Sequence, residues 1–230
     1  SEQIDFDEAE VGAILFIPLN DDAPGHGGGF ERNNFVERIQ QYLTKVLREA
    51  KIHSSWINPN DEYEQAVYKF VADILSSESP FMPGFIAFQQ PIARAGIFNS
   101  LSQTLLKMTI PGVPDFYQGT ELWDFSLVDP DNRRPVDFSL RTGLLQKDAS
   151  ISSGQWETGE IKLKWTARLL DLRARHADVF ARGGYTPLAV QGRHADHVIA
   201  FTRSHKEKAV SIVTLRHFAP LMEDFTEWPD

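Results

Sequence analysis

The sequence predicts a mixed α and β fold that is mainly helical in its first half and ends in a partial antiparallel β domain. In the first half, apolar residues recur at intervals of three and four, which is typical of amphipathic helices. Beyond Gly183-Gly184, three short runs rich in β-forming residues are separated by turn signals. With 230 residues, 42% of them hydrophobic and 24% charged, the chain is long enough to bury a core and typical of a soluble globular protein.

Two helices are predicted in the first third of the chain. The first has an apolar face formed by Phe35, Ile39, Leu43, Val46, Leu47 and Ala50. The second is predicted to begin with Asn58 as its N-cap and Pro59 at its first helical position. Its wide buried stripe is predicted to hold Tyr63, Ala66, Val67, Phe70, Val71, Ile74 and Leu75.

A third helix is predicted at about 92–108, and its small side chains would let another element approach closely. Pro111-Gly112 ends it and leads into a short strand at 113–117. Pro114 lacks a backbone N–H, so this strand is expected at an edge or at a strand end.

The last third is predicted to change character. A polar linker at 150–154 leads to a helix at 161–176, with Arg173 and Arg175 in its last turn, where the helix dipole favours cations. The three strand-like runs that follow are 185–190, 197–203 and 209–216, with a hairpin turn at 204–208.

Composition argues against several functions. A formal charge of −9, from 32 acids against 23 Lys and Arg, argues against binding nucleic acid or an anionic membrane. The absence of cysteine excludes disulfides and thiol chemistry and fits a reducing compartment, so we expect a cytoplasmic protein. No apolar run approaches the roughly 20 residues that span a bilayer.

No cofactor or metal site is predicted. The glycine-rich stretch at 25–29 lacks the preceding strand and the Lys-Ser/Thr ending of a phosphate loop. The seven histidines show no metal-ligand spacing, and His194 and His197 are interpreted as a solvated pair.

The stretch 111–138 combines acids, two adjacent arginines and exposable aromatic residues. Such side chains can grip a sugar, which offers in-plane hydroxyls and an apolar ring face. A surface loop folded on its own salt bridges explains the composition equally well. Five carboxylates are plentiful enough for acid/base pairing, but spacing cannot show which of them face each other: Asp115, Glu121, Asp124, Asp129 and Asp131.

This stretch closely resembles maltooligosyltrehalose synthases, which are (β/α)8-barrel members of the α-amylase superfamily (glycoside hydrolase family 13). The segment P-G-V-P-D-F-Y-Q-G-T-E is similar to the region of the eighth barrel strand, and L-W-D-F-S-L-V-D-P-D-N-R-R-P-V-D-F is more particular to the trehalose-forming members. Residues 47–60, 93–107 and 169–188 also resemble the family, in order, so that the resemblance covers about 30–216. Residues 1–29 match poorly.

The resemblance implies an enzyme that converts the reducing-end α-1,4 bond of a maltooligosaccharide into an α,α-1,1 trehalose bond. The reaction is a retaining intramolecular transglucosylation, with an Asp nucleophile, a Glu acid/base and a stabilising Asp. We find none of the motifs that carry those three acids, so no catalytic residue is assigned and the chain alone is expected to be inactive. It is similar to the C-terminal part of such a synthase and would lack the N-terminal portion of the barrel.

The same resemblance implies an order of domains. Residues 1–110 would form a helical region, 111–178 the last barrel strand, a sugar-binding loop and the final barrel helix, and 179–230 a partial C-terminal β domain. One strand cannot close a barrel, so where the rest of the protein would pack we expect apolar surface that is either exposed or covered by self-association.

Within the fragment, the resemblance implies contacts with a maltooligosaccharide. Gln118 and Glu121 follow a strand end that faces the active site in this superfamily, and Tyr117 and Trp123 could stack on a glucose face. Hydrogen bonds to sugar hydroxyls, or support of the catalytic carboxylates, are expected from Asp129, Asp131, Asn132, Arg133 and Arg134. The alternative is that the two arginines only pair with Asp129 and Asp131 to hold the loop.

Other functions remain open from the sequence. The chain could be a glucan-binding or partner-binding module of a split enzyme, and the parent protein could be a related α-amylase-type hydrolase. Upstream coding sequence, sugar titration and product analysis would separate these hypotheses.

Overall fold

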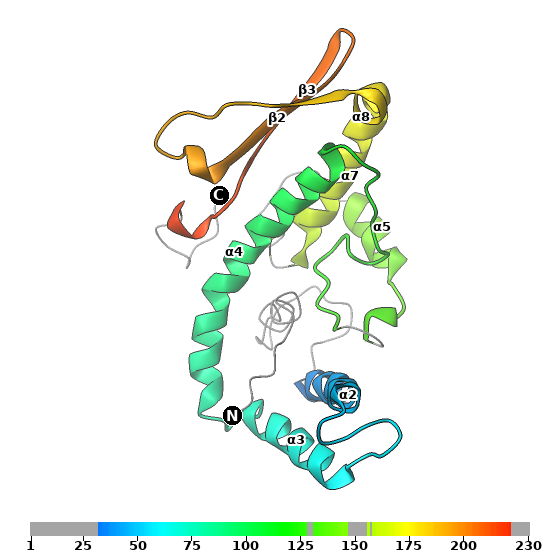
Figure 1. Cartoon of the computed structure of the whole chain (residues 1–230), viewed down its shortest axis with the longest axis vertical. Coiled ribbons are helices and arrows are strands. Elements are labelled where there is room, and N and C mark those ends of the chain that lie inside the picture. The colour runs from blue at the N-terminus through cyan, green and yellow to red at the C-terminus, as the bar shows by residue number, and fades with distance from the viewer. Residues whose placement is uncertain (1–31, 128–130, 147–155, 157, 222–230) are drawn as a thin grey trace. The chain divides into compact units, whose positions relative to one another are not determined.

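The computed structural model describes residues 32–127, 131–146, 156 and 158–221 (Figure 1). It combines helices with one three-stranded antiparallel sheet, in the order β1-β2-β3, so the predicted mixed fold class is confirmed at that level. The predicted glycine-rich break at 25–29, the linker at 150–154 and Asp129 lie outside the described residues. The chain divides into two compact units, one containing residues up to Ala93 with Phe125–Val136, the other containing Arg94–Asp124 and the residues from Asp137 onward.

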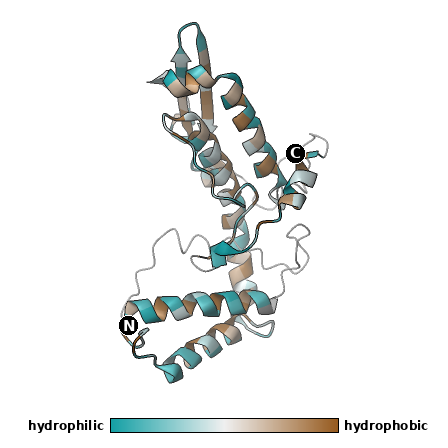
Figure 2. Cartoon of the chain, turned by 90° about the vertical axis from the view of Figure 1, so that its right-hand side faces the viewer, coloured by the Kyte–Doolittle hydropathy of each residue, from teal (hydrophilic) through white to brown (hydrophobic). Residues whose placement is uncertain are grey.

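The first unit is built on α2 (Arg32–Ala50) and α3 (Asp61–Ile74), with a short 3-10 turn, η1, at Asp131–Arg133. Both helices carry hydrophilic and hydrophobic residues along their length, as expected of amphipathic helices (Figure 2). Their apolar sides meet in a core formed by Phe35, Ile39, Tyr42, Val71 and Leu127. The predicted first helix is therefore confirmed, and of its predicted apolar face Phe35 and Ile39 are buried and Leu43 and Val46 partly buried, whereas Ala50 is exposed.

The start and the buried face of α3 differ from the prediction. The N-cap is Asn60 rather than Asn58, because the Asn60 side chain accepts a hydrogen bond from the Tyr63 N–H at 3.2 Å and the acids of the first turn follow it directly. Phe70, expected in the buried stripe, is 62% exposed, whereas Glu64 is only 2% exposed. The side of α3 that faces α2 is thus partly polar.

Helix α4 (Phe81–Thr109) begins eleven positions before the predicted start at residue 92 and contains Pro91. Proline removes one helical N–H and clashes with the preceding turn, yet the helix continues through Pro91. The compact units divide within this helix, between Ala93 and Arg94. None of the helices among the described residues has the length and apolarity needed to cross a membrane.

The second unit holds the second part of α4, then α5 (Phe138–Gln146), α7 (Glu160–Arg175) and α8 (Ala177–Arg182). The predicted helix at 161–176 is confirmed as α7, with Leu169 buried and Arg173 and Arg175 in its last turn. The strand predicted at 113–117 does not form. A strand exists only when another strand pairs with it, and none does so among the described residues.

The predicted β module is confirmed. It consists of β1 (Gly184–Pro187), β2 (Val198–His205) and β3 (Lys208–Leu215), with β1 shorter than expected. The β2–β3 hairpin turns at Lys206-Glu207, and its register pairs His205 with Lys208 and Val198 with Leu215. Two short 3-10 turns flank the hairpin, η2 (Ala195–His197) and η3 (Ala219–Leu221).

Arg203 on β2 ties this sheet to two helix ends. Its side chain is 2% exposed and donates to the Thr109 carbonyl at the end of α4 at 2.9 Å and to the Phe180 carbonyl on α8 at 3.0 Å. The carbonyls at a helix C-terminus carry partial negative charge, so they compensate the buried guanidinium.

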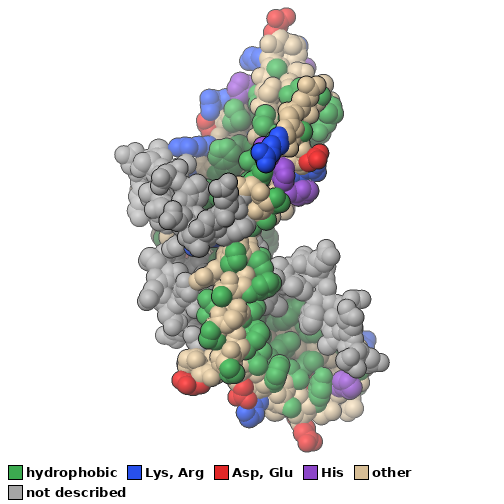
Figure 3. All heavy atoms as spheres, turned by 90° about the vertical axis from the view of Figure 1, so that its left-hand side faces the viewer, with side chains coloured by type: hydrophobic (Ala, Val, Ile, Leu, Met, Phe, Trp, Pro, Cys, Tyr) green, Lys and Arg blue, Asp and Glu red, His purple; other side chains and the backbone are tan. Residues whose placement is uncertain are grey.

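Many large hydrophobic side chains remain exposed, as expected if further protein covers them (Figure 3). The most exposed are Ile57 at 97% and Val113 at 95%.

Candidate functional site

The predicted sugar-binding stretch is divided between the two units. Residues up to Asp124 belong to the second unit, and Phe125–Val136 belong to the first. The predicted residues thus fall into two polar clusters, one within each unit, and each is described by itself.

In the first unit, Asp131 is held by Arg38 of α2. The Arg38 Nε donates to Oδ1 at 2.9 Å and its Nη2 donates to Oδ2 at 2.7 Å, a bidentate pair with good geometry. The Leu127 N–H donates to the same Oδ2 at 2.7 Å, and Arg38 also donates to the Phe125 carbonyl at 2.8 Å. Arg38 therefore fastens the loop to α2 at Asp131 and Phe125, and the Leu127 hydrogen bond closes the loop on itself.

The environment of Asp131 keeps it ionised. Burial by itself would raise its pKa, but the hydrogen bonds from Arg38 and Leu127, with the charges of Arg38 and Arg134, outweigh burial and lower the pKa. Asp131 is thus a fixed negative charge at neutral pH.

Arg134 braces the same loop but keeps much of its guanidinium in solvent. Its Nε lies 3.2 Å from Asp131 Oδ1 and donates to the Asp131 carbonyl at 3.0 Å, while its Nη2 donates to Ser126 Oγ at 3.2 Å. Its side chain is 54% exposed, so it still presents N–H donors to solvent. Asn132 and Arg133, also predicted to bind sugar, lie at the exposed surface.

In the second unit, Glu121 folds back on its own turn. Its Oε2 accepts from the Gly119 N–H at 3.0 Å and from Arg141 Nε at 3.1 Å. Arg141 on α5 also donates to the Gly119 carbonyl at 2.6 Å, so it clamps both sides of the turn. The neighbouring Tyr117 and Gln118 are exposed, with Tyr117 at 53%.

Trp123 is packed within the second unit. Its Nε1–H donates to the Trp156 carbonyl at 2.7 Å, and Lys162 Nζ lies 5.4 Å from its ring centroid. A Cβ added at Gly159, where φ is +77°, would lie 3.0 Å from Trp123 Cδ1, so glycine is needed for this close approach.

Lys162 is the titratable group of this cluster with the most altered environment. Burial, with the nearby charge of Lys107, lowers its pKa to about 8, against the opposing influence of Asp124 and Glu121. Its Nζ donates to the Leu122 carbonyl at 3.4 Å, a long hydrogen bond that compensates little of the burial.

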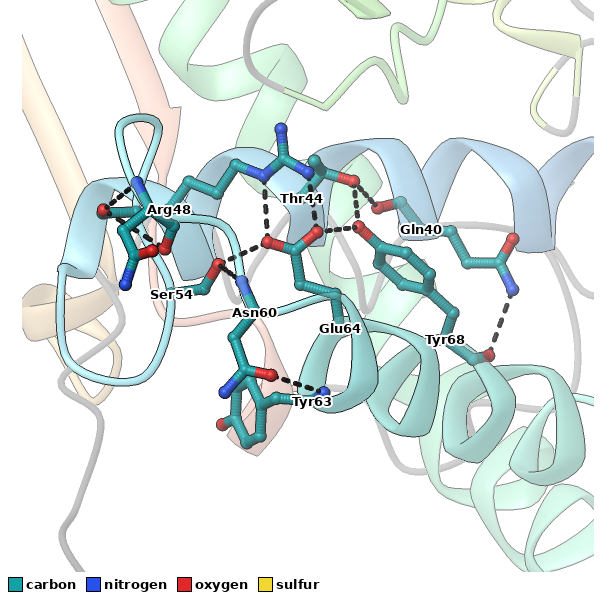
Figure 4. A network of polar contacts seen from close by, with 10 residues as sticks. Gln40, Thr44, Arg48, Ser54, Asn60, Tyr63, Glu64 and Tyr68 are labelled. Atoms are coloured by element: carbon teal, nitrogen blue, oxygen red, sulfur yellow. Dashed lines mark hydrogen bonds and ion pairs between the residues drawn. The ribbon is translucent and has the colours of Figure 1, made fainter.

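A third polar cluster, absent from the sequence prediction, surrounds Glu64 in the first unit (Figure 4). Arg48 Nε donates to Oε1 at 2.9 Å and Nη2 to Oε2 at 2.8 Å, and Ser54 Oγ donates to Oε1 in a short hydrogen bond. Tyr68 OH reaches Oε2 at 3.4 Å and shares a 2.6 Å hydrogen bond with Thr44 Oγ1. The hydrogen bonds from Arg48 and Ser54 outweigh burial and lower the pKa of Glu64 to about 2.

One sequence signal could have indicated this cluster and the Arg38 pair. Glu64 shares a helix face with Tyr68 and Val71, and Arg38 lies three positions after the buried Phe35 and four before the buried Tyr42. A charged residue on an apolar helix face is expected to have a partner of opposite charge.

Metal binding has no candidate in the described parts of the chain, where no group of three or more His, Asp or Glu residues is arranged to hold an ion. His194 and His197 have ring centroids 6.1 Å apart, and His197 Nδ1 lies 3.1 Å from the His217 carbonyl oxygen.

Known proteins resemble this chain in sequence and in structure. A protein of Mycobacterium tuberculosis, provisionally named a maltooligosyl trehalose synthase, is 40% identical over 167 residues, which is 72% of this chain and 20% of the relative. A crystal structure of a maltooligosyl trehalose synthase superposes with a TM-score of 0.72 at 36% identity, over 86% of this chain and 26% of that one. The chain is similar to maltooligosyltrehalose synthases. The resemblance predicted from the sequence is thereby confirmed.

A second solved structure agrees. The maltooligosyltrehalose synthase of Arthrobacter ramosus gives a TM-score of 0.67 at 33% identity, over 81% of this chain and 24% of that one. No protein-family model matches the chain. The chain spans only about a fifth to a quarter of the length of these synthases, which is consistent with a C-terminal fragment.

Proposed function

We propose that this chain is the C-terminal part of a cytoplasmic maltooligosyltrehalose synthase. The whole enzyme would convert the reducing-end α-1,4 bond of a maltooligosaccharide into an α,α-1,1 bond by retaining intramolecular transglucosylation. The observation that carries the proposal is the likeness to a crystal structure of such a synthase, with a TM-score of 0.72 at 36% identity over 86% of this chain.

In the whole enzyme, residues 111–178 would supply the last barrel strand, a sugar-binding loop and the final barrel helix, between the helical region 1–110 and the partial β domain 179–230. The conformation and exposure of residues 113–117 support this arrangement. The segment pairs with no strand among the described residues, and Val113 in it is 95% exposed, as expected for a strand whose neighbours would come from another part of the enzyme.

The loop around Asp131 would form one wall of the sugar site. Asp131 is buried and ionised, and its two oxygens already accept from Arg38, Arg134 and Leu127, so its part would be to hold in place the loop that presents Asn132, Arg133 and Arg134 to the sugar. Arg134 offers exposed donors beside it, and Asn132 and Arg133 extend the polar surface. Asp129, Tyr117, Gln118, Glu121 and Trp123 complete the proposed set of sugar contacts.

The three catalytic carboxylates would lie in another part of the enzyme. The nucleophile, the acid/base and the stabilising carboxylate belong to barrel strands that precede this chain, so the fragment alone binds at most part of a sugar and does not turn it over.

Product analysis with maltopentaose tests the proposal. A whole synthase that contains this sequence should give products with trehalose ends, and the chain alone should give none. Release of glucose or free trehalose would indicate a hydrolase instead. Calorimetric titration of the chain alone with maltopentaose tests the alternative that the chain is a glucan-binding module. Firm binding at millimolar sugar would favour that alternative.

A further inference from the structure

The loop between α2 and α3, residues 51–60, exposes three large apolar side chains. Ile52 is 64% exposed, Trp56 55% and Ile57 97%. Residues 52–60 contain no Asp, Glu, Lys or Arg, although 24% of the chain is charged. Single exposed apolar residues are ordinary, but three of them within one short uncharged stretch are typical of a binding surface.

Hydrogen bonds hold this 51–60 loop in one conformation. Ser54 is 5% exposed, and its Oγ donates to Glu64 and accepts from the Asn60 N–H at 3.0 Å (Figure 4). A tight turn closes the tip, because the Ser55 N–H donates to the Asn58 carbonyl at 3.2 Å and the Asn58 N–H donates to Ser55 Oγ at 3.0 Å.

The same network orients the indole of Trp56. Arg48, fixed by its bidentate pair with Glu64, places its guanidinium carbon 5.1 Å from the Trp56 ring centroid. One face of the ring therefore lies against a fixed cation, while the side chain as a whole stays largely exposed.

A buried ion pair contributes little net stability, because removing both charges from water offsets their attraction. The Glu64 network is better explained by what it fixes, which is the shape of the 51–60 loop. Preordered loops bind with a smaller loss of conformational entropy, and tryptophan is among the residues that contribute most to protein interfaces.

We propose that the 51–60 loop is a docking surface for the part of the synthase that lies outside this chain. This rests on the proposed function, which makes the chain one part of a longer enzyme, and the chain spans 20% to 26% of the length of its relatives. The uncharged stretch 52–60, with two isoleucines beside its tryptophan, fits an apolar protein surface better than an ionic partner or the hydroxyl-rich edge of a sugar.

The test compares the Ile57→Asp variant in two settings, the chain alone and a whole synthase that contains it. Ile57 is almost fully exposed in the chain, so the variant should leave the thermal midpoint of the chain within about 1 °C. In the whole synthase the same carboxylate would be buried against apolar protein, and the midpoint should fall by roughly 3 °C or more. Gln65→Asp is the control, because it adds the same charge at an exposed position of α3. It should lower the midpoint of the chain and of the whole synthase by less than Ile57→Asp lowers that of the whole synthase.

An unchanged midpoint of the Ile57→Asp whole synthase would overturn the proposal. An unchanged midpoint with a tenfold higher KM for maltopentaose would also overturn it and would assign the loop to sugar instead. Ile57→Ser, a milder change, should give the same pattern with a smaller shift. The function is judged separately, because a whole protein that forms no trehalose ends can still show the lowered midpoint.

Discussion

Arg38 and Asp131, 93 positions apart in the sequence, form a bidentate pair with N–O distances of 2.9 and 2.7 Å. Both side chains are largely buried, with 13% of Arg38 and 8% of Asp131 exposed. The pair joins the proposed sugar loop to α2, so the position of this loop depends on a helix that carries no proposed sugar contact.

Replacing Arg38 by methionine should destabilise the chain, because it leaves the Asp131 carboxylate buried without its cation. We expect the free energy of unfolding in urea to fall by about 2–4 kcal/mol. Lys69→Met is the control, since it removes an ion pair with Asp73 whose side chains are 75% and 62% exposed, and it should cost less than about 1 kcal/mol. Equal losses in the two variants would contradict the account.

Arg134→Ala separates sugar binding from loop support. In a whole synthase we expect it to lower turnover of maltopentaose while leaving the melting temperature unchanged, because the Arg134 side chain is 54% exposed and Arg38 already holds Asp131. If the melting temperature falls together with turnover, Arg134 only supports the loop. Its hydrogen bonds with Asp131 and Ser126 are the observation that favours this alternative.

Glu64 should make the chain sensitive to acid. Its pKa is about 2 in the folded chain and near 4.5 ordinarily, so the unfolded chain binds more protons between these values. The stabilisation from Glu64 is thus fully present above about pH 5 and is lost as the pH falls towards 2. Unfolding measured across this range should show a steeper loss for the native chain than for Glu64→Gln, which should already be less stable at pH 7. Parallel curves for the two proteins would exclude the effect.

Lys162 and Lys164, two positions apart on α7, should respond in opposite ways to replacement by methionine. The pKa of Lys162 is lowered to about 8 by burial, so its charge is unfavourable at pH 7, and Lys162→Met should stabilise the chain by about 1 kcal/mol. Lys164 pairs with Glu160 at 2.7 Å, with 7% and 9% of the side chains exposed, so Lys164→Met should destabilise it.

Lys162 should also make the stability of the chain depend on pH. Between about pH 8 and 10.5 the unfolded chain binds the Lys162 proton and the folded chain does not, so stability from this group rises with pH in that window. Lys162→Met should abolish the rise. Its persistence in the variant would show that another group causes it.

Local elements could be predicted from the sequence because local spacing determines them. Phe35 and Ile39 are buried on α2 as their periodicity predicts, and the β2–β3 hairpin turns within the predicted stretch. Features that depend on residues far away in the sequence, or on protein outside this chain, could not be predicted from it. Helix α4 continues through Pro91, and 113–117 has no partner strand within the part of the chain that the structure describes.

The polar clusters show the same limit. Asp131 was predicted as a site residue, but Arg38 was not, since nothing in the spacing links two residues 93 positions apart. Glu64 lies on the same face of α3 as the buried Val71. Its partners Arg48 and Ser54 come from other segments of the chain, so only the folded structure identifies them.

The most direct test of the central claim is the product formed from maltopentaose by a whole synthase that contains this sequence, compared with the chain alone. The account predicts products ending in an α,α-1,1 bond from the whole protein and no turnover by the chain. Release of glucose or trehalose without such ends, or turnover by the chain alone, would contradict it.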